Sequence, residues 1–356
     1  MKEIARLAKV SLGTVSHVLN NSAKVREPLR QRVLDVVASL NYQPNQLARG
    51  LRRDKTNIIG MIIPDITNPF FPAVVRGAED AAFGSGYRLV LCNADNDPSK
   101  EIVYMNELKT YLPAGLIVIP SSDSEITLQA DRFQRDGSVV VCIDRMPQHW
   151  KGDSVTVANE DGAMQATQHL VHLGHRRVAT VTGPLHLAIA KARLAGFRMA
   201  LKKGDLQVPA DFVQESTFDS AGGYSAALRL LQMHPRPTAI LAQNDVMAMG
   251  VLRAARELRL ACPEDVSIFG FDGLEVTELL DPPLSSVVQP GYELGRLGVQ
   301  TLIARVNDGA RSVEHLVLPT ELRLRASVAH PPLDTAPRKK RRIAPQLSPP
   351  SSAVSS

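Results

Sequence analysis

Residues 4–21 read IARLAKVSLGTVSHVLNN, and this stretch decides how the N-terminal part of the chain folds. Apolar residues repeat at helical spacing over residues 4–8 and again over residues 15–19. Ser11 stands just before the second repeat, where its hydroxyl can cap a helix. The spacing therefore predicts two short helices joined by a tight connection, the arrangement of a helix-turn-helix.

A third helix is predicted to begin near Glu27-Pro28, because proline is tolerated in the first turn of a helix. It places five apolar residues on one face: Leu29, Val33, Val36, Val37 and Leu40. Three amphipathic helices of this kind can bury one small core.

The second helix of a helix-turn-helix enters the major groove of DNA, and its first residues reach the base edges. Leu12 offers an apolar surface to a thymine methyl group, His17 can donate to a guanine, and Gly13 contributes no side chain. Hydroxyl and amide side chains nearby suit phosphate oxygens. The predicted DNA contacts here are Ser11, Leu12, Gly13, Thr14, Ser16, His17 and Asn20. The alternative is a three-helix module that binds protein and whose basic residues are merely solvated.

Residues 41–53, NYQPNQLARGLRR, follow as a proline break and barely two turns of helix with a glycine inside. An interior glycine costs about 1 kcal/mol relative to alanine, so this helix should be unstable alone and fold only against DNA. Leu51 could wedge between base steps of the minor groove, with Arg49 in its negative potential and Ala48 allowing close approach. The predicted contacts of this hinge are Asn45, Ala48, Arg49 and Leu51.

Charge is unevenly distributed along the 356 residues, which carry a net charge of +5. Residues 1–55 hold 11 basic and 4 acidic side chains, residues 331–356 hold 5 and 1, and the part between is therefore at −6. A basic head on an acidic body indicates a polyanion as the partner of the head, and double-stranded DNA is the first candidate.

From residue 57 the pattern changes to short apolar runs, typical of buried parallel strands, separated by helical stretches such as 71–84, 162–173 and 246–258. The runs are 58–63, 88–92, 115–119, 139–143, 178–181, 239–242 and 266–270. Strands that alternate with helices predict an α/β core of doubly wound parallel sheets, in which ligands bind beyond the carboxyl ends of the strands.

Polar and aromatic residues follow these runs in a combination that suits a polyhydroxylated ring. They include carboxylates, an amide, a guanidinium and phenyl rings. Any single aspartate among them could equally be a turn or helix cap. Their occurrence at six strand ends favours a binding site for a small molecule.

Motifs for catalysis, cofactors and metals are missing from this region. There is no G-x-G-x-x-G after a strand, no phosphate-binding G-x4-G-K-[ST] loop and no G-x-S-x-G turn. His169, His172 and His175 are spaced by three, but Gly174 looks like a helix stop, so polar histidines at a helix end are preferred to a zinc site. We therefore expect no enzyme activity, no cofactor and no metal. The three cysteines, Cys92, Cys142 and Cys262, are expected to be reduced and buried.

The residues of the head resemble the LacI/GalR family of bacterial transcriptional regulators. The likeness rests on Ile4-Ala5-Arg6-Leu7-Ala8-Lys9-Val10-Ser11, Thr14-Val15-Ser16, Val18-Leu19-Asn20, Leu40-Asn41-Tyr42-x-Pro44-Asn45 and Ala48-Arg49-x-Leu51. In the body it extends through Asn68-Pro69-Phe70-Phe71, His169-Leu170-x-x-Leu173-Gly174-His175, Arg193-x-x-Gly196-Phe197, Asn244-Asp245-x-Met247-Ala248-x-Gly250 and Gly270-Phe271-Asp272. The chain departs from its relatives in two places. They carry a few residues before the first helix, and a larger base-reading side chain where this chain has Gly13.

The resemblance implies a core similar to periplasmic sugar-binding proteins, with two lobes, three crossovers near residues 157, 286 and 318, and an effector in the cleft between the lobes. By this likeness the effector-binding residues would be Phe70, Asp144, Arg193, Phe218, Asn244 and Asp272, with Arg193 and Asp272 as polar anchors. A sugar or sugar derivative is preferred to a nucleobase as the effector.

The same likeness implies a transcriptional regulator, more specifically a repressor, that binds a palindromic operator as a homodimer. It also implies an effector whose binding shifts the hinge between an ordered and a frayed state. The expected domains are a helix-turn-helix at 1–44, a hinge at 45–56, a core at 57–329 (lobe 1 at 57–157 and 287–317, lobe 2 at 158–286 and 318–329) and a disordered basic tail at 330–356. The run Arg338–Arg342 favours a nonspecific DNA-affinity tail over a nuclear signal.

Two other functions remain as alternatives. A free sugar-binding transport protein would explain the body but would need an export signal, and a doubly wound enzyme would need a cofactor loop or a nucleophile. The sequence shows no secretory signal and no membrane-spanning run, so we expect a cytoplasmic protein that does not contact the membrane.

Overall fold

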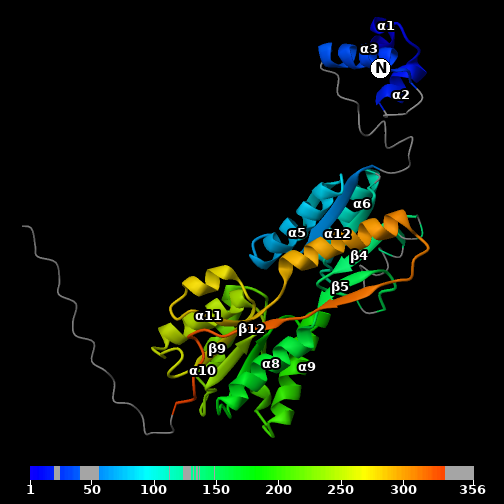
Figure 1. Cartoon of the computed structure of the whole chain (residues 1–356). Coiled ribbons are helices and arrows are strands. Elements are labelled where there is room, and N and C mark those ends of the chain that lie inside the picture. Colours follow the sequence, from blue (N-terminus) through cyan, green and yellow to red (C-terminus); the bar gives the residue numbers. More distant parts are fainter. Residues whose placement is uncertain are drawn as a thin grey trace, which may run out of the picture. The chain divides into compact units, whose positions relative to one another are not determined.

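The computed structural model describes residues 1–19, 25–40, 56–111, 113–122, 130, 132–133, 135, 137–147 and 149–332 (Figure 1). The chain divides into two compact units. Unit 1 comprises Met1–Asn159, Leu185–Ala192 and Gln289–Glu321, and unit 2 comprises Glu160–Pro184, Arg193–Val288 and Leu322–Ser356.

Three short helices form the N-terminal head: α1 (Lys2–Leu7), α2 (Leu12–Leu19) and α3 (Glu27–Ser39). Their apolar faces bury a small core made of Ile4, Ala8, Val15, Val18 and Val33. Leu40, which helical spacing assigned to the same face, follows the end of α3 and is 42% exposed. The predicted three-helix arrangement is confirmed.

The sheet of unit 1 has the strand order β11-β5-β4-β3-β1-β2. Its paired strands run parallel, from β1 with β2 at one edge to β5 with β11 at the other. The strands are β1 (Ile58–Ile63), β2 (Arg88–Asn93), β3 (Gly115–Val118), β4 (Val139–Ile143), β5 (Ser154–Val157) and β11 (His315–Leu318).

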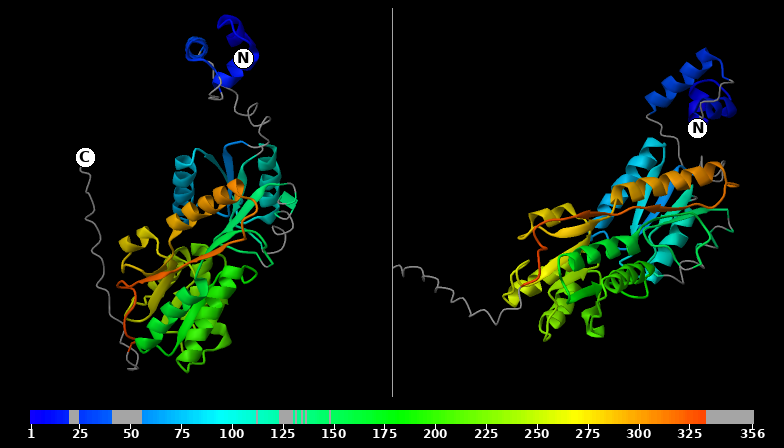
Figure 2. Two further views of the ribbon diagram at one scale, coloured as in Figure 1. Left: turned by 45° about the vertical axis from the view of Figure 1, so that its right-hand side comes forward. Right: turned by 60° about the horizontal axis from the view of Figure 1, so that its bottom comes forward.

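Helices cover both faces of this sheet. α5 (Phe70–Gly84) and α12 (Gly291–Asn307) lie side by side on one face, as Figures 1 and 2 show from several directions. α6 (Pro98–Thr110) packs on the other face, where Leu108 and Met105 meet Leu116 of β3 in one apolar cluster. Burial on both faces explains why the inner strands β1, β3 and β4 read as continuous apolar runs. The run 88–92 was also predicted to be buried, but it forms the edge strand β2, where Val90 and Leu91 are exposed.

The sheet of unit 2 repeats the same winding, with the strand order β12-β10-β9-β8-β6-β7. The pairs from β7 to β10 are parallel. The strands are β6 (Val178–Thr182), β7 (Val213–Glu215), β8 (Ala239–Ala242), β9 (Ser267–Asp272), β10 (Ser285–Val288) and β12 (Glu321–Arg323). A short 3-10 helix, η1 (Ala210–Phe212), precedes β7, and another, η2 (Glu275–Leu279), follows β9.

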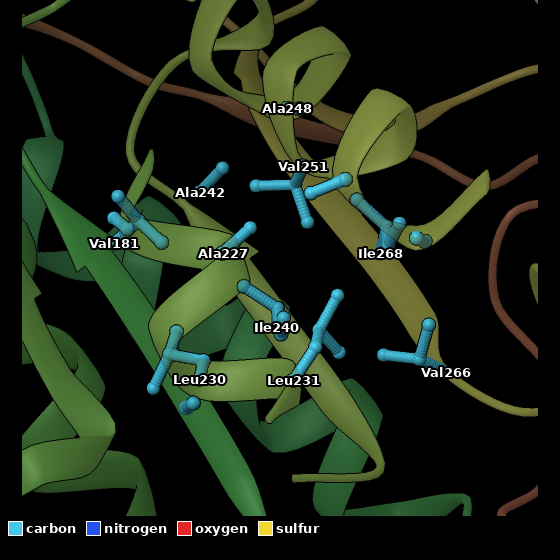
Figure 3. Packing of buried hydrophobic residues seen from close by; sticks show 14 of the residues in the cluster. Val181, Ala227, Leu230, Leu231, Ile240, Ala242, Ala248, Val251, Val266 and Ile268 are labelled. Carbon is cyan, nitrogen blue, oxygen red and sulfur yellow. The ribbon is translucent and has the colours of Figure 1, made fainter. Parts of the chain in front are cut away.

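The core of unit 2 lies between this sheet and two helices, α10 (Ser220–Leu231) and α11 (Asp245–Glu257). Figure 3 shows Leu230 and Val251 of the helices pointing toward Ile240 and Ile268 of the sheet. On the opposite face lies α8 (Asn159–His172), whose His169 ring stands edge-on to Phe269, 6.2 Å between centroids. α9 (Ala188–Lys203) packs closely against α8, since a Cβ on Gly196 would lie 2.0 Å from the carbonyl oxygen of Glu160.

Two doubly wound parallel sheets and a helical head confirm the predicted fold class. In the described parts of the chain, no helix is long and apolar enough to cross a membrane. The predicted hinge contacts Asn45, Ala48, Arg49 and Leu51, the predicted DNA contact Asn20 and residues 333–356 of the basic tail lie outside the described residues.

Candidate functional site

The outer face of α2 in the head is the candidate DNA-binding surface. Leu12 is 44% exposed although it is apolar, and Gly13 and His17 are also exposed, while Val15 and Val18 point into the small core. A Cβ on Gly13 would meet only the Ser11 hydroxyl, at 3.6 Å. The fold therefore does not require glycine at this position, and a larger side chain would fit.

Ser11 caps α2 as its position predicts. Its Oγ accepts a hydrogen bond from the backbone N–H of Thr14 at 3.0 Å and lies 2.9 Å from the Thr14 hydroxyl. This bond satisfies one of the free N–H groups at the start of the helix. Ser11 thus has a structural role, in addition to its place at the end of the helix that would approach DNA.

In each sheet the strand order reverses at one point, and ligands of doubly wound proteins bind beyond the carboxyl ends of the strands at such a point. The reversal lies between β1 and β3 in unit 1 and between β6 and β8 in unit 2. The predicted effector-binding residues follow strands of these two sheets. Phe70 and Asp144 belong to unit 1, and Arg193, Phe218, Asn244 and Asp272 belong to unit 2.

Arg193 lies at the reversal point of unit 2 and is only 2% exposed. Its Nη1 donates to the backbone carbonyl of Gln243, which directly follows β8. The guanidinium carbon stands 3.8 Å from the ring centroid of Phe271, and Nη1 is 3.9 Å from Oδ1 of Asp272. A cation stacked on a ring and paired with a carboxylate is held in one orientation.

Asp272 ends β9 and is 6% exposed. Its backbone φ of 117° is unusual for a residue with a side chain, and so is the φ of 61° at Asp144, which follows β4. Backbone strain of this kind costs of the order of 1–3 kcal/mol and persists where the surroundings impose it, often at a ligand site. Both predicted carboxylates of the site are therefore held in unfavourable conformations.

Asn244 and Phe218 are joined to this arrangement through the loops after β8 and β7. Asn244 caps α11 by accepting from the N–H of Met247 at 2.7 Å, and its Nδ2 donates to the carbonyl of Phe218 at 3.1 Å. The Phe218 ring lies against Gly183, where a Cβ would be 2.1 Å from the ring. Asn244 is therefore a helix cap that also fixes the Phe218 loop.

In unit 1, Phe70 begins α5 and is buried, with its ring edge-on to Phe71 at 5.4 Å between centroids. Asp144 is buried and is followed by Arg145, which sequence reasoning did not select. Arg145 is also buried and donates to the carbonyl of Pro120 at 3.2 Å. The sequence shows that Arg145 follows a strand, but it does not show whether its side chain is buried or faces solvent. Only the structure shows that it is buried.

Other buried polar groups lie near the carboxyl ends of the strands. Gln289, directly after β10, is buried and was not predicted. Glu101 of α6 is 1% exposed, and burial raises its pKa to about 7 although the N–H of Ser121 donates to it. Glu101 was missed because a glutamate on a helix normally faces solvent.

His169 and His175 have structural partners, and His172 is exposed. His175 is fully buried, with Nδ1 2.9 Å from the Thr238 hydroxyl and Nε2 2.9 Å from the carbonyl of Ala329. Burial lowers its pKa, and that of His169 as well. His175 is thus a core residue that holds the chain segment after β12, and no cluster able to hold a metal is found among the residues that the structure describes.

The three cysteines are free thiols, as expected, but only Cys142 is fully buried, whereas Cys92 and Cys262 are partly exposed. Burial raises the pKa of each, that of Cys262 to about 12, so the thiols stay protonated near neutral pH.

Comparison with known proteins matches both parts of the chain. Residues 1–45 match bacterial regulatory proteins of the lacI family, and residues 167–328 match the periplasmic binding protein-like domain. The ribose operon repressor of Escherichia coli K12 is 36% identical over 330 residues, covering 92% of this chain and 99% of the repressor.

Solved structures show the same likeness. The lac repressor dimer bound to operator and the anti-inducer ONPF has a TM-score of 0.83 at 27% identity, covering 92% of this chain and 98% of the repressor. A LacI family regulator from Enterococcus faecium with bound ribose has a TM-score of 0.70 at 30% identity, covering 77% of this chain and 99% of that protein.

Proposed function

Because the chain belongs to the lacI family of bacterial regulatory proteins, we propose that Arg193 and Asp272 are the polar anchors of its effector site and that the effector is a sugar. The chain is a DNA-binding transcriptional repressor controlled by a small-molecule effector.

The observation that carries the proposal is the buried Arg193–Asp272 pair at the reversal point of the unit 2 sheet. A guanidinium and a carboxylate, 3.9 Å apart, offer donors and acceptors side by side. The neighbouring hydroxyls of a sugar are both donors and acceptors, so they can bond to both charged groups at once. Phe218 of the same unit would supply an apolar face, and Asn244 a further polar contact.

Ribose is the first candidate among sugars. Ribose operon repressors are among the relatives at 36% identity, and one solved relative at 30% identity holds ribose. A nucleobase is the second candidate, and a flat ring without hydroxyls would rely on the phenyl rings more than on the Arg193–Asp272 pair.

The direct test is calorimetric titration of the full chain with ribose, other monosaccharides, disaccharides and purine bases. Saturable binding of a sugar is expected. Binding of a purine base with no binding of any sugar would contradict the proposal.

For the DNA side, we propose that a homodimer places two heads on a palindromic operator, with the exposed end of each α2 in the major groove. The effector would shift the balance between a state with ordered hinges and one with frayed hinges. The proposal assigns the chain no catalytic step, no cofactor and no metal. Its place of action is the cytoplasm, where a bacterial repressor meets chromosomal DNA.

His17→Ala tests the assignment of α2 as the base-reading helix. His17 is exposed on the outer face of α2, so its removal should leave the fold intact. We expect base discrimination to fall about tenfold at one pair of symmetric operator positions, since one good contact to a base edge is worth about 1–3 kcal/mol. Selection from a randomised operator library measures this, with His234→Ala, an exposed histidine of unit 2, as the matched control. An unchanged preference at every position would remove His17 from the reading residues.

A further inference from the structure

Asp245, the first residue of α11, has a fully buried side chain that sequence reasoning would treat as part of a helix cap. The side chain instead reaches the loop after β9. Its Oδ2 accepts from the backbone N–H of Leu274 at 2.7 Å, and its Oδ1 accepts from the Ser286 hydroxyl at 2.6 Å. Ser286 Oγ in turn accepts from the N–H of Gly273 at 3.1 Å. Asp245 and Ser286 together hold the two N–H groups that directly follow Asp272.

The local backbone is shaped to admit the Asp245 carboxylate. A Cβ on Gly270 would lie 2.1 Å from Asp245 Oδ1, so the carboxylate rests directly on β9 two residues before Asp272. Gly273 has a φ of 75°, a conformation that glycine adopts without strain. Gly270 therefore leaves room for the Asp245 carboxylate next to the backbone before Asp272, and Gly273 adopts the backbone conformation that the loop after Asp272 requires.

The groups around Asp245 favour its charged form, but burial opposes it. Burial has the largest effect and raises the pKa of Asp245 to about 7. The N–H groups, the Ser286 hydroxyl and the Arg325 guanidinium act in the opposite direction and lower the pKa by less. Arg325, which lies beyond β12, also donates to the Thr277 hydroxyl at 3.0 Å and to Glu278. Asp272, at the end of β9, is paired with Arg193, and the carboxylates of Glu275 and Glu278 follow in η2. Protonation of Asp245 near neutral pH would remove an acceptor from the loop.

We propose that Asp245 is a positioning residue for the effector: through Leu274 and Ser286 it fixes the strained loop that holds Asp272 opposite Arg193. The inference rests on the proposed effector role of Arg193 and Asp272. Asp245 itself need not touch the effector. Asp245 also links the loop after β9 to the loop that carries Phe218. It directly follows Asn244 in the chain, and Asn244 holds the Phe218 loop by a hydrogen bond.

The test is calorimetric titration of the full chain with D-ribose between pH 6 and 8.5. Asp245→Asn preserves size but turns an acceptor oxygen into an NH2 donor, which must face either the N–H of Leu274 or the Ser286 hydroxyl. At pH 8 we expect the Kd for ribose to rise about tenfold, the effect of leaving one buried donor unpaired.

The pH profile separates positioning from a general structural role. The wild-type protein should lose affinity as the pH falls below about 7 and Asp245 becomes protonated, and Asp245→Asn should lack this decrease. Asp211→Asn, an exposed aspartate of the same unit, is the matched control and should keep the wild-type profile. Ser286→Ala removes the bridging hydroxyl without changing a charge and should weaken binding less while keeping the pH dependence.

The outcomes are distinguishable. Asp245→Asn with the wild-type Kd and pH profile would overturn the inference and leave the proposed function intact. If Asp245→Asn does not fold, the test is the affinity of Ser286→Ala for ribose. Wild-type affinity in Ser286→Ala would then overturn the inference. A wild-type protein that binds no ribose and no other sugar would contradict the proposed function, and the inference with it.

Discussion

Arg193→Met is expected to weaken sugar binding about 100-fold, because removing one partner of a buried charge pair costs about 3 kcal/mol. Methionine preserves much of the length of the side chain and its contact with Phe271, but it cannot donate to the Gln243 carbonyl or balance the charge of Asp272. Calorimetry with ribose measures the loss, and operator binding should no longer respond to the sugar.

The matched control is Arg198→Met, the same substitution on the same helix at an exposed position. It should bind sugar as the wild-type protein does. Equal losses in the two variants would indicate a general effect of charge or folding, and full affinity in Arg193→Met would show that Arg193 is not an anchor.

Gly295→Ala is expected to destabilise unit 1 by about 2–3 kcal/mol, although alanine is the better helix former by about 1 kcal/mol. A Cβ on Gly295 of α12 would lie 1.8 Å from the carbonyl oxygen of Val74 on α5. The contact is reciprocal, since a Cβ on Gly77 would lie 1.9 Å from the carbonyl oxygen of Tyr292. Backbone cannot move aside as a flexible side chain can, so the two helices would have to separate.

Thermal unfolding of the full chain should show the melting temperature of unit 1 lowered by about 5–10 °C. Gly84→Ala is the control, because this glycine ends α5 and a Cβ there would meet nothing within 4 Å. The control should be as stable as the wild-type protein or slightly more stable. A Gly295→Ala variant that is also unaffected would contradict the close approach of α5 and α12.

The parts of the fold that could be predicted were those whose sequence carries a local physical signal. Continuous apolar runs such as 58–63 became buried strands, and Ser11 became the cap of α2 because capping is a local interaction. Strands such as β5 and β10 were missed. β10 begins with Ser285 and Ser286, two buried serines whose hydroxyls bond to residues elsewhere in unit 2. No local pattern reveals partners that lie about 40 residues away.

The same distinction holds for the candidate site. Asp272 and Asn244 could be selected because the carboxyl ends of parallel strands are where such folds bind ligands. The stacking of Arg193 on Phe271, the burial of Arg145 and the link from Asp245 to Leu274 could not, because each depends on how separate segments pack. An aspartate at a helix start has the same sequence signature whether it only stabilises the helix or holds a distant loop.

The measurement that tests the central claim most directly is selection of operator DNA from a randomised duplex library by the full chain, with and without D-ribose. The account predicts that the retained duplexes share a palindrome and that ribose changes their retention in the wild-type protein but not in Arg193→Met. Retention without a shared sequence, or a palindrome whose retention does not respond to ribose or responds equally in both proteins, would contradict it.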